Sequence, residues 1–357
     1  MHVRRLWLTD FRSYPTADLT LAPGFTAVLG SNGEGKTNVL EAIAWLATLG
    51  SFRGAPTEAL IRTGADRAVI RAEAERDGRE LLLEAELATR GRNRVQVNRQ
   101  PLRRARDLLG ALRVTVFSPD DLALVKGGPG ERRRYLDDTL VALHPRNDGL
   151  RSEVERVLRQ RNALLKQSGG RLGENVASTL DVWDAKLVEA GERLVRVRRD
   201  LLARLQPALA AAYDQVAGRP TEVSANYAAA WAVGGLADAL AAARPDDLRR
   251  RVSTVGPHRD EVELALGALP ARTHASQGEQ RSLALALRLA AHEVVTGATG
   301  SAPVLLLDDV FSELDPDRSD ALLVHLPPGQ TILTSASGLP AGAEPDRVVR
   351  IADLMAR

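Results

Sequence analysis

The hydrophobic pattern divides the chain into strand-rich ends and a helical middle. Short segments in which apolar and polar residues alternate, or in which apolar residues run together, have the period of β-strands. Such segments occur at 2–8, 18–21, 25–29, 66–98, 112–117, 260–265, 303–309, 331–335 and 347–352. Two helices are expected among them, one over 36–48 and a longer one from residue 277. This combination predicts an α/β fold.

The middle of the chain, from about residue 120 to residue 216, has a helical period with few strand signals. Leucines recur there every seven residues at Leu180, Leu187, Leu194 and Leu201, and the seam between them is filled by Trp183, Ala190 and Val197. This repeat is typical of a short coiled coil, with 152–167 as an antiparallel partner and 168–175 as the bend. Two helices of an ordinary bundle would satisfy the same pattern. The alanine-rich region 203–246 also has a helical period.

The strand-rich segments flank the helical middle, so we expect one α/β head that is split in the sequence. Its first part would be 1–120 and its second part 251–357, with a helical arm, 121–250, inserted between them. A chain of 357 residues is long enough for one large or two ordinary domains.

Composition narrows the class of protein. Hydrophobic residues make up 44% of the chain, which is enough for a core, and charged residues make up 26%. Cysteine is absent, which excludes a disulfide scaffold, a thiolate metal site and a cysteine nucleophile. The six histidines show no metal-binding spacing. Because no segment resembles a signal peptide or a membrane span, we expect a cytoplasmic protein with no membrane partner.

Nearly all the positive charge comes from arginine. The formal net charge is +2 and the pI is about 9.1, and the four lysines are Lys36, Lys126, Lys166 and Lys186. Lys36 lies at a glycine-rich turn, which indicates that this position needs a compact ammonium group rather than a planar guanidinium.

The strongest motif follows the expected strand 25–29 and leads into the expected helix 36–48, the context that a phosphate-binding loop requires. Its residues are Gly30, Ser31, Asn32, Gly33, Glu34, Gly35, Lys36 and Thr37. The glycines let the loop turn so that backbone N–H groups and the helix N-terminus surround phosphate oxygens. Lys36 would reach the β- and γ-phosphates, and Thr37 would place its hydroxyl on Mg²⁺. The alternative is an ordinary glycine-rich turn with a surface lysine.

A second motif ends a buried apolar strand with two carboxylates, Asp308 and Asp309. Next to a phosphate-binding loop, Asp308 would hold Mg²⁺ or its water, and Asp309 could polarise an attacking water. The residues that follow, 311–316, would then lie close to the γ-phosphate.

A third stretch opens the long helix expected from residue 277. Its residues are Ser276, Gln277, Gly278, Glu279 and Gln280. A capping box would explain the serine and the glutamate but not the other three residues. Together with 30–37, 308–309 and 312–315, the stretch matches the order of the ATP-binding cassette: Walker A, signature, Walker B and D-loop. It resembles the cassette signature with Gln in place of the first glycine. That resemblance implies a homodimer, in which each signature helix points at the ATP held by the other copy.

A narrower resemblance covers the chain from residue 5 onward. It rests on DFRSY (10–14), NGEGKTN (32–38), SFR (51–53), FSPDDL (117–122), RRRYLD (132–137), RQRN (159–162), VGPHRD (255–260) and LDDVFSELD (307–315). In order and spacing these segments resemble the RecF family of bacterial recombinational repair. The resemblance implies a P-loop ATPase head of the cassette type, similar to SMC heads, with a short helical lever arm. It also implies that Arg12 and Asn38 lie beside the nucleotide.

The same resemblance implies an activity in recombinational repair and replication restart. It consists of ATP-driven homodimerisation on duplex DNA and at junctions of single and double strands, with slow, DNA-stimulated ATP hydrolysis. The implied partners are RecR and, in the same pathway, RecO and RecA. The implied outcome is the loading of RecA. ATP and Mg²⁺ are the implied cofactors.

Three departures from transporter-type cassettes concern hydrolysis. Residues 117–121 contain no glutamine, Asp309 stands where a glutamate is usual, and Thr334 stands where a switch histidine is usual. They predict a slow hydrolase that uses ATP as a clamp, with Asp315 in its D-loop. A transporter or translation cassette is one alternative, which the missing histidine and the long helical insert disfavour. An SMC-like scaffold that binds ATP without useful turnover is the other.

Three arginine clusters are candidates for contacts with DNA phosphates, although each would also suit a solvated face. They are Arg103, Arg104 and Arg106, then Arg132, Arg133 and Arg134, and finally Arg249, Arg250 and Arg251. With four Trp, four Tyr and five Phe, a stacking platform for single strands is poorly supported. Binding to the duplex backbone, with a steep salt dependence, is the better hypothesis. His258, within 255–260, has no assigned role.

Overall fold

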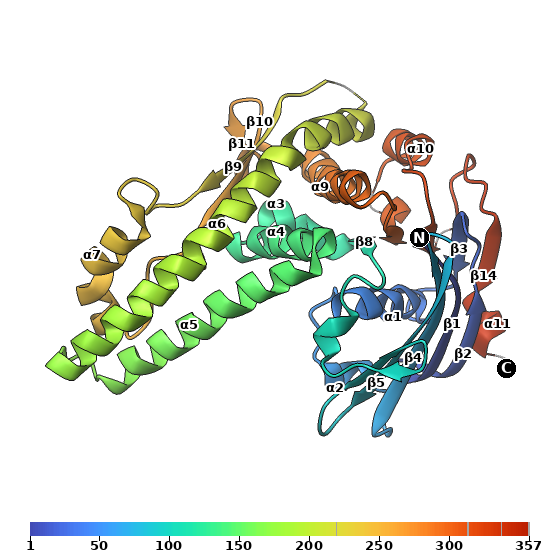
Figure 1. The fold of residues 1–357 in the computed structure, drawn as a ribbon. Coiled ribbons are helices and arrows are strands. Elements are labelled where there is room, and N and C mark those ends of the chain that lie inside the picture. The colour runs from blue at the N-terminus through green and yellow to red at the C-terminus, as the bar shows by residue number, and fades with distance from the viewer. Residues whose placement is uncertain (219, 313, 337, 356–357) are drawn as a thin grey trace. The chain divides into compact units, whose positions relative to one another are not determined.

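The computed structural model describes residues 1–218, 220–312, 314–336 and 338–355 (Figure 1). The chain forms two compact units: the first contains 1–125, 208–221 and 275–357, and the second contains 126–207 and 222–274. The bounds of the second unit therefore differ from those of the expected arm, 121–250. The difference arises mainly because the strand after residue 260 pairs within the second unit.

The first unit contains a five-stranded parallel sheet in the order β14-β3-β13-β12-β8. Its strands are β3 (Phe25–Leu29), β8 (Val114–Phe117), β12 (Val304–Asp308), β13 (Thr331–Ser335) and β14 (Arg347–Arg350). Every residue of β12 and β13 is buried, which is the pattern of parallel strands covered on both faces. The strands expected at 303–309, 331–335 and 347–352 are confirmed, except that residues 351–352 begin α11 instead of continuing β14.

The first unit also contains several helices. They are α1 (Lys36–Thr48), α2 (Thr57–Leu60), α9 (Gln277–Thr299), α10 (Pro316–Val324) and α11 (Ile351–Met355), and α3 (Ala123–Lys126) lies at the boundary. In α1, the predicted face of Val39, Ile43 and Leu46 is fully buried, and so are residues on its other sides. α9 ends at Gly300, whose left-handed conformation is a common helix stop.

A six-stranded antiparallel sheet completes the first unit, in the order β2-β1-β4-β5-β6-β7. Its strands are β1 (His2–Phe11), β2 (Tyr14–Thr20), β4 (Arg67–Arg76), β5 (Arg79–Ala88), β6 (Arg94–Val97) and β7 (Gln100–Pro101). In β4 the buried side chains alternate, as in Ala68, Ile70 and Ala72. They join the same hydrophobic core as α1. The strand meander expected over 66–98 is confirmed.

The second unit is mainly helical. Its helices are α4 (Pro129–Leu143), α5 (Asp148–Gln167), α6 (Glu174–Ala217, with its last residues in the first unit), α7 (Gly235–Arg250) and α8 (Ala271–His274). The four leucines of the predicted seven-residue repeat are all buried in α6. Leu236, Leu240 and Leu248 of α7 join the apolar clusters of α5 and α6. The bundle interpretation therefore describes these helices better than an isolated two-stranded coiled coil.

A small antiparallel sheet in the second unit departs from the sequence analysis. It has the order β11-β10-β9, with β9 (Val223–Ala228), β10 (Glu261–Leu266) and β11 (Leu269–Pro270). β9 falls within 203–246, where a helical period was expected. Its sequence, VSANYA, buries the alternating Val223 and Ala225. Small residues give a weak strand signal, and pairing with β10 decides the conformation instead.

None of the helices in the described ranges is both long enough and apolar enough to cross a membrane.

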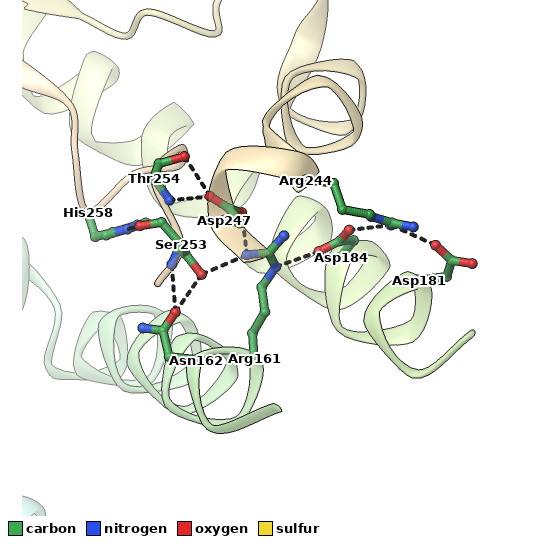
Figure 2. Close-up of polar contacts among 9 residues, drawn as sticks. All are labelled: Arg161, Asn162, Asp181, Asp184, Arg244, Asp247, Ser253, Thr254 and His258. Carbon is green, nitrogen blue, oxygen red and sulfur yellow. Dashed lines mark hydrogen bonds and ion pairs between the residues drawn. The ribbon is translucent and has the colours of Figure 1, made fainter. Parts of the chain in front are cut away.

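A buried ion-pair network joins the three long helices of the second unit (Figure 2). Arg161 of α5 is fully buried and donates to Asp184 of α6 at 2.6 Å, to Asp247 of α7 at 2.6 Å and to the Ser253 hydroxyl at 2.9 Å. Asn162 accepts hydrogen bonds from both the backbone N–H and the hydroxyl of Ser253. One guanidinium thus fixes the spacing of three helices and the start of the segment that follows α7.

Removing this guanidinium should destabilise the second unit. An Arg161→Met substitution keeps the apolar stem but leaves the buried Asp247 carboxylate without its cation, so the local unfolding free energy should fall by about 3–5 kcal/mol. Arg159→Met is the matched control, because Arg159 is 69% exposed and lies 4.0 Å from its acidic neighbour. Its effect should stay within about 0.5 kcal/mol. Native-state hydrogen exchange in α5 and α7 measures both, and equal effects would contradict the assignment.

Candidate nucleotide-binding site

The loop between β3 and α1 has the conformation that a phosphate cradle needs. Gly33 and Gly35 have φ angles of +86° and +101°, which favour glycine over residues with a Cβ atom. At Gly35 a Cβ would also lie 2.6 Å from the Ser13 hydroxyl. The two glycines therefore allow the chain to turn and enter α1 directly, so that the first N–H groups of this helix face the loop.

Contacts within the loop hold it in shape. The Lys36 ammonium group is largely buried and donates to the Ser31 carbonyl at 2.8 Å. The Glu34 carboxylate accepts the Ser31 N–H at 2.7 Å. Asn38 donates to Ser13 at 3.0 Å. The charged nitrogen of Lys36 is thus drawn over the loop rather than extended into solvent, which excludes the simple surface-lysine interpretation.

Three distant segments meet at Asp308. Its Oδ1 accepts hydrogen bonds from the Thr37 hydroxyl at 2.8 Å and from the Thr334 hydroxyl at 2.7 Å. The parallel pairing of β12 with β13 brings Asp308 and Thr334 opposite one another. Burial raises the pKa of Asp308, and the neighbouring Asp309 charge adds to this, whereas the two hydroxyl groups and Arg53 oppose it.

Asp309 follows at the end of β12 with its backbone in the left-handed region, at φ +48°. Its N–H donates to the carbonyl and the hydroxyl oxygen of Thr334, at 3.1 Å and 3.0 Å. These bonds fix the turn immediately after the strand. The Asp309 side chain is only partly buried, so the carboxylate is accessible at the edge where the loop lies.

Two side chains near the loop have roles that the motif alone does not reveal. Arg12 forms a bidentate pair with the fully buried Glu41 of α1, at 2.7 and 2.8 Å, and donates to the Ala59 carbonyl at 2.9 Å. Its guanidinium therefore braces α1, and its contact with a nucleotide stays a prediction. Tyr14 donates to the Gly35 carbonyl at 3.0 Å. Burial and the charge of Glu34 raise the pKa of Tyr14, which keeps this donor protonated.

The signature helix, α9, begins with the capping box that the sequence permits. Ser276 Oγ accepts the Glu279 N–H at 3.3 Å, and the Glu279 carboxylate accepts the Ser276 N–H at 2.8 Å. The Ser276 and Gln277 side chains are exposed, whereas Gln280 is buried. Within the described residues, the hydrogen bonds of the Ser276 side chain stay in this turn, so the structure does not join it to the loop of its own chain.

Gly278 and the expected D-loop lie against each other. A Cβ at Gly278 would be 2.5 Å from Arg318 Nη1. Arg318 is bound to Asp315, whose carboxylate also caps α10 by accepting the Arg318 N–H at 2.9 Å. Gly278 is therefore the residue that lets the signature helix approach the D-loop side chains, which the sequence did not predict. Glu313, within 312–315, lies outside the described residues.

The candidate DNA-contacting arginines lie in very different surroundings. Arg103, Arg104 and Arg250 are exposed. Arg132 is buried in a bidentate pair with Glu261 at 2.8 Å, so it does not lie on a surface, and the expected contact with DNA has no structural basis there. Arg133 is half-buried and donates to the Asp260 carbonyl at 2.5 Å.

The residues present suit a magnesium ion that binds together with a nucleotide. Thr37 and Asp308 offer adjacent hard oxygen atoms, and Mg²⁺ commonly takes one or two such protein ligands while phosphates and waters complete its shell. Over the described ranges there is no group of three or more His, Cys, Asp or Glu side chains that could hold a metal by themselves. The donor set therefore fits an ion that arrives with the triphosphate.

Comparison with known proteins defines the class to which this fold and site belong. Residues 2–332 match the family model described as RecF/RecN/SMC N terminal domain. The chain is 47% identical to the DNA replication and repair protein RecF of Streptomyces avermitilis over 353 residues, covering 94% of each chain. It is 45% identical to the protein of the same name from Kineococcus radiotolerans, covering 94% of this chain and 93% of that one.

Solved structures agree with this classification. The recombination mediator protein RecF of the RecFOR pathway, in its ATP form, matches with a TM-score of 0.89 and 28% identity, over 98% of this chain and 95% of that one. An Smc head bound to the winged-helix domain of ScpA has the same fold, with a TM-score of 0.55 and 17% identity over 94% of this chain and 90% of that one. The first unit is thus an SMC-type ATPase head. The chain belongs to the RecF family of DNA replication and repair proteins.

The buried Asp308 carboxylate should limit stability and support magnesium binding at the same time. Because the folded protein holds the Asp308 proton more tightly than the unfolded chain does, stability falls as pH rises from the ordinary pKa through the raised one. Asp308→Asn should remove that fall and raise the Tm of the nucleotide-free protein at neutral pH. Mg²⁺ should increase the affinity of wild type for ATP, and the substitution should make that increase about 10–100-fold smaller.

Calorimetric titration of ATP with and without Mg²⁺, together with thermal melts from pH 4 to pH 8, measures both effects. Asp309→Asn is the control, because its partly buried side chain lies outside the hydrogen bonds to Thr37 and Thr334. It should retain the magnesium dependence. An Asp308→Asn protein that keeps full magnesium dependence would show that the carboxylate does not serve the ion.

Proposed function

We propose that the protein binds ATP and Mg²⁺, dimerises through the bound nucleotide on duplex DNA, and hydrolyses ATP slowly. The observation that carries this proposal is the meeting of Lys36, Thr37, Asp308 and Thr334 at one end of the parallel sheet. In an ordinary glycine-rich turn, we would not expect the Thr37 hydroxyl at the start of the helix to donate to the Asp308 carboxylate of a distant strand.

The residues of the site divide the work. The loop N–H groups and α1 would surround the β-phosphate, and Lys36 would move from the Ser31 carbonyl to the phosphate oxygens. Thr37 and Asp308 would hold Mg²⁺, which supplies charge neutralisation between the β- and γ-phosphates. Asp309, fixed by its backbone bonds to Thr334, would orient and polarise the attacking water.

Slow turnover follows from the group at the switch position. Thr334 is fully buried, donates to Asp308 and accepts from the Asp309 N–H. A threonine in that role positions its neighbours but offers no titratable group to the reaction. With Asp309 as the candidate base, ATP would act chiefly as a clamp between two copies.

The dimer would complete the site. One chain has one phosphate-binding loop and one signature helix, and the exposed Ser276 hydroxyl and Gln277 stand at the N-terminus of α9. A helix N-terminus attracts anions, and the γ-phosphate held by a second copy would meet it there. One solved relative is described as a recombination mediator protein RecF in the RecFOR pathway, which supports RecO and RecR as partners of this chain. A role with RecA in gap repair in the cytoplasm is part of the same proposal.

An arginine-rich edge of the antiparallel sheet is the preferred DNA contact. Around β6 and β7, the exposed arginines are Arg90, Arg92, Arg94, Arg99, Arg103, Arg104 and Arg106. Within the described part of the chain, no ion pair engages them, unlike Arg71 on the same sheet, which lies 2.6 Å from Glu84. Unpaired guanidinium groups in a row suit the phosphates of a duplex.

Substitutions in the signature helix should separate ATP binding from dimerisation. Ser276→Asp keeps a good N-cap but places a negative charge against the incoming phosphate. It should bind ATP with wild-type affinity and contribute one chain of 38.5 kDa to each particle, whereas wild type with ATP, Mg²⁺ and duplex DNA should contribute two. Ser276→Arg should also lose dimers, and Ser276→Thr should keep them. Light scattering provides the readout.

Two variants of the phosphate site complete this set. Asp309→Asn should retain dimers and lose hydrolysis by about 10²-fold or more, and Lys36→Arg should lose ATP-dependent dimers. If wild type stays monomeric with ATP, Mg²⁺ and DNA, the clamp proposal fails. If Asp309→Asn hydrolyses ATP as fast as wild type, the protein is better described as a scaffold whose turnover is incidental.

The arginine-rich edge predicts a specific change in salt dependence. Each phosphate contact contributes about 0.9 to the slope of log affinity against log salt. Arg103→Gln with Arg104→Gln should therefore reduce the slope by about 2 and leave ATP binding unchanged. Arg71→Gln is the matched control and should change neither. Fluorescence anisotropy with a labelled duplex at several salt concentrations measures the slope, and an unchanged slope in the double variant would exclude this edge.

A further inference from the structure

The second unit contains a cavity that the proposed function does not use. Its volume is about 220 Å³, and it lies among α4, α5, α6 and the segment after α7. Charged residues on its wall are Arg133, Arg134, Asp137, Arg151, Glu155 and Arg198. The arginines outnumber the acids by four to two. The lining also contains His258 and four apolar side chains.

The charges on the wall are not balanced equally. Arg198 is neutralised by Asp137, which accepts two hydrogen bonds from it at 2.7 and 2.8 Å. Arg133 has no ion pair within the described ranges, and its Nη1 meets a backbone carbonyl, that of Asp260. Burial and the nearby charge of Arg198 lower the pKa of Arg133. The charges of Glu261 and Asp260 oppose this shift only in part. Arg133 is therefore a half-buried cation on the cavity wall whose charge is incompletely balanced, which favours an anionic occupant.

The remaining wall is apolar. Val154 and Leu158 come from α5, Leu194 from α6, and Pro257 from the segment after α7. Only small parts of Val154, Leu158 and Leu194 are exposed, and an inorganic ion has no apolar atoms to cover them. A carboxylate on a short hydrocarbon stem would cover them while its charge reached Arg133. The cavity is also an indentation that admits one projecting group, whereas duplex phosphates lie along a continuous backbone.

His258 also lines the cavity, and a hydrogen bond fixes its ring. Its Nε2 lies 3.0 Å from the Ser253 carbonyl, which can only accept, so Nε2 carries the proton. Burial lowers the pKa of His258 to about 4, and the ring is neutral at pH 7. Its buried Nδ1 is then an acceptor that has no hydrogen-bond partner among the described residues.

The network around Arg161 fixes this part of the wall in advance (Figure 2). Arg161 and Asn162 of α5 hold the Ser253 side chain, and Ser253 holds the His258 ring through its carbonyl. The histidine therefore cannot easily turn away from its position. A preorganised wall loses less conformational freedom when a ligand binds.

We propose that this cavity is a docking site for an acidic protein segment, and that Arg133 binds the carboxylate of a Glu or Asp side chain whose stem packs on Val154, Leu158 and Leu194. The site is separate from both the nucleotide site and the arginine-rich edge. Under this proposal, Arg133 binds a protein carboxylate and not the DNA phosphates suggested by its place in the arginine cluster 132–134.

The His258 ring provides a reporter inside the cavity. In protein labelled with ¹³C-histidine, the Cε1–H signal of His258 is one of six, because the chain has six histidines, and it is identified by its loss in His258→Gln. The probes are the peptide acetyl-ALELA-amide, its isostere acetyl-ALQLA-amide, inorganic phosphate, and a 20-base-pair duplex. Each is titrated separately at constant ionic strength.

The glutamate peptide should shift the His258 signal saturably, and the glutamine isostere should bind at least about tenfold more weakly. Arg133→Gln should weaken the glutamate peptide by a similar factor, Arg133→Lys should restore part of the affinity, and Arg159→Gln, outside the cavity, should have no effect. No saturable shift with the glutamate peptide would overturn the proposal. A shift caused by phosphate or the duplex but not by the peptide would also overturn it and assign the cavity to nucleic acid.

Discussion

The hydrogen bonds that converge on Asp308 are the constraint on which the nucleotide site depends. Thr37 at the start of α1 and Thr334 at the end of β13 donate to the same oxygen of a carboxylate at the end of β12. Three pieces of chain are thereby held in one geometry before any ligand binds. The carboxylate is buried at an energetic cost, which the elevated pKa of Asp308 reflects. Under the proposed function, a divalent cation bound beside Asp308 would relieve that cost.

The features that could be predicted best from the sequence are those that depend on residues close together in the chain. The phosphate-binding loop and the two aspartates are recognisable because a strand, a glycine turn and a helix follow one another within a short segment. The parallel strands and the antiparallel meander were also predictable, since buried runs and alternation are local patterns. The capping box of Ser276 with Glu279 was predictable for the same reason, because its two residues are one helical turn apart.

Features that depend on tertiary pairing were not predictable from the pattern. Arg132 and Arg133 are adjacent in the sequence, yet one is buried against Glu261 and the other faces a cavity. Arg12 resembles any loop arginine until the buried Glu41 of α1 is placed beside it. β9 exists because β10 pairs with it. The closeness of Gly278 and Arg318 depends on how two helices pack. In each case the deciding partner is distant in the chain.

The order of strands in the parallel sheet bears on how the protein is made. β3, which leads into the phosphate-binding loop, lies between β13 and β14, and both come about 300 residues later in the chain. At ~5–20 residues per second, the ribosome needs on the order of 15–60 s to deliver these neighbours. A nascent chain must therefore carry an apolar strand with neither neighbour during that interval. The antiparallel sheet, whose strands all end by Pro101, can form first and shelter it.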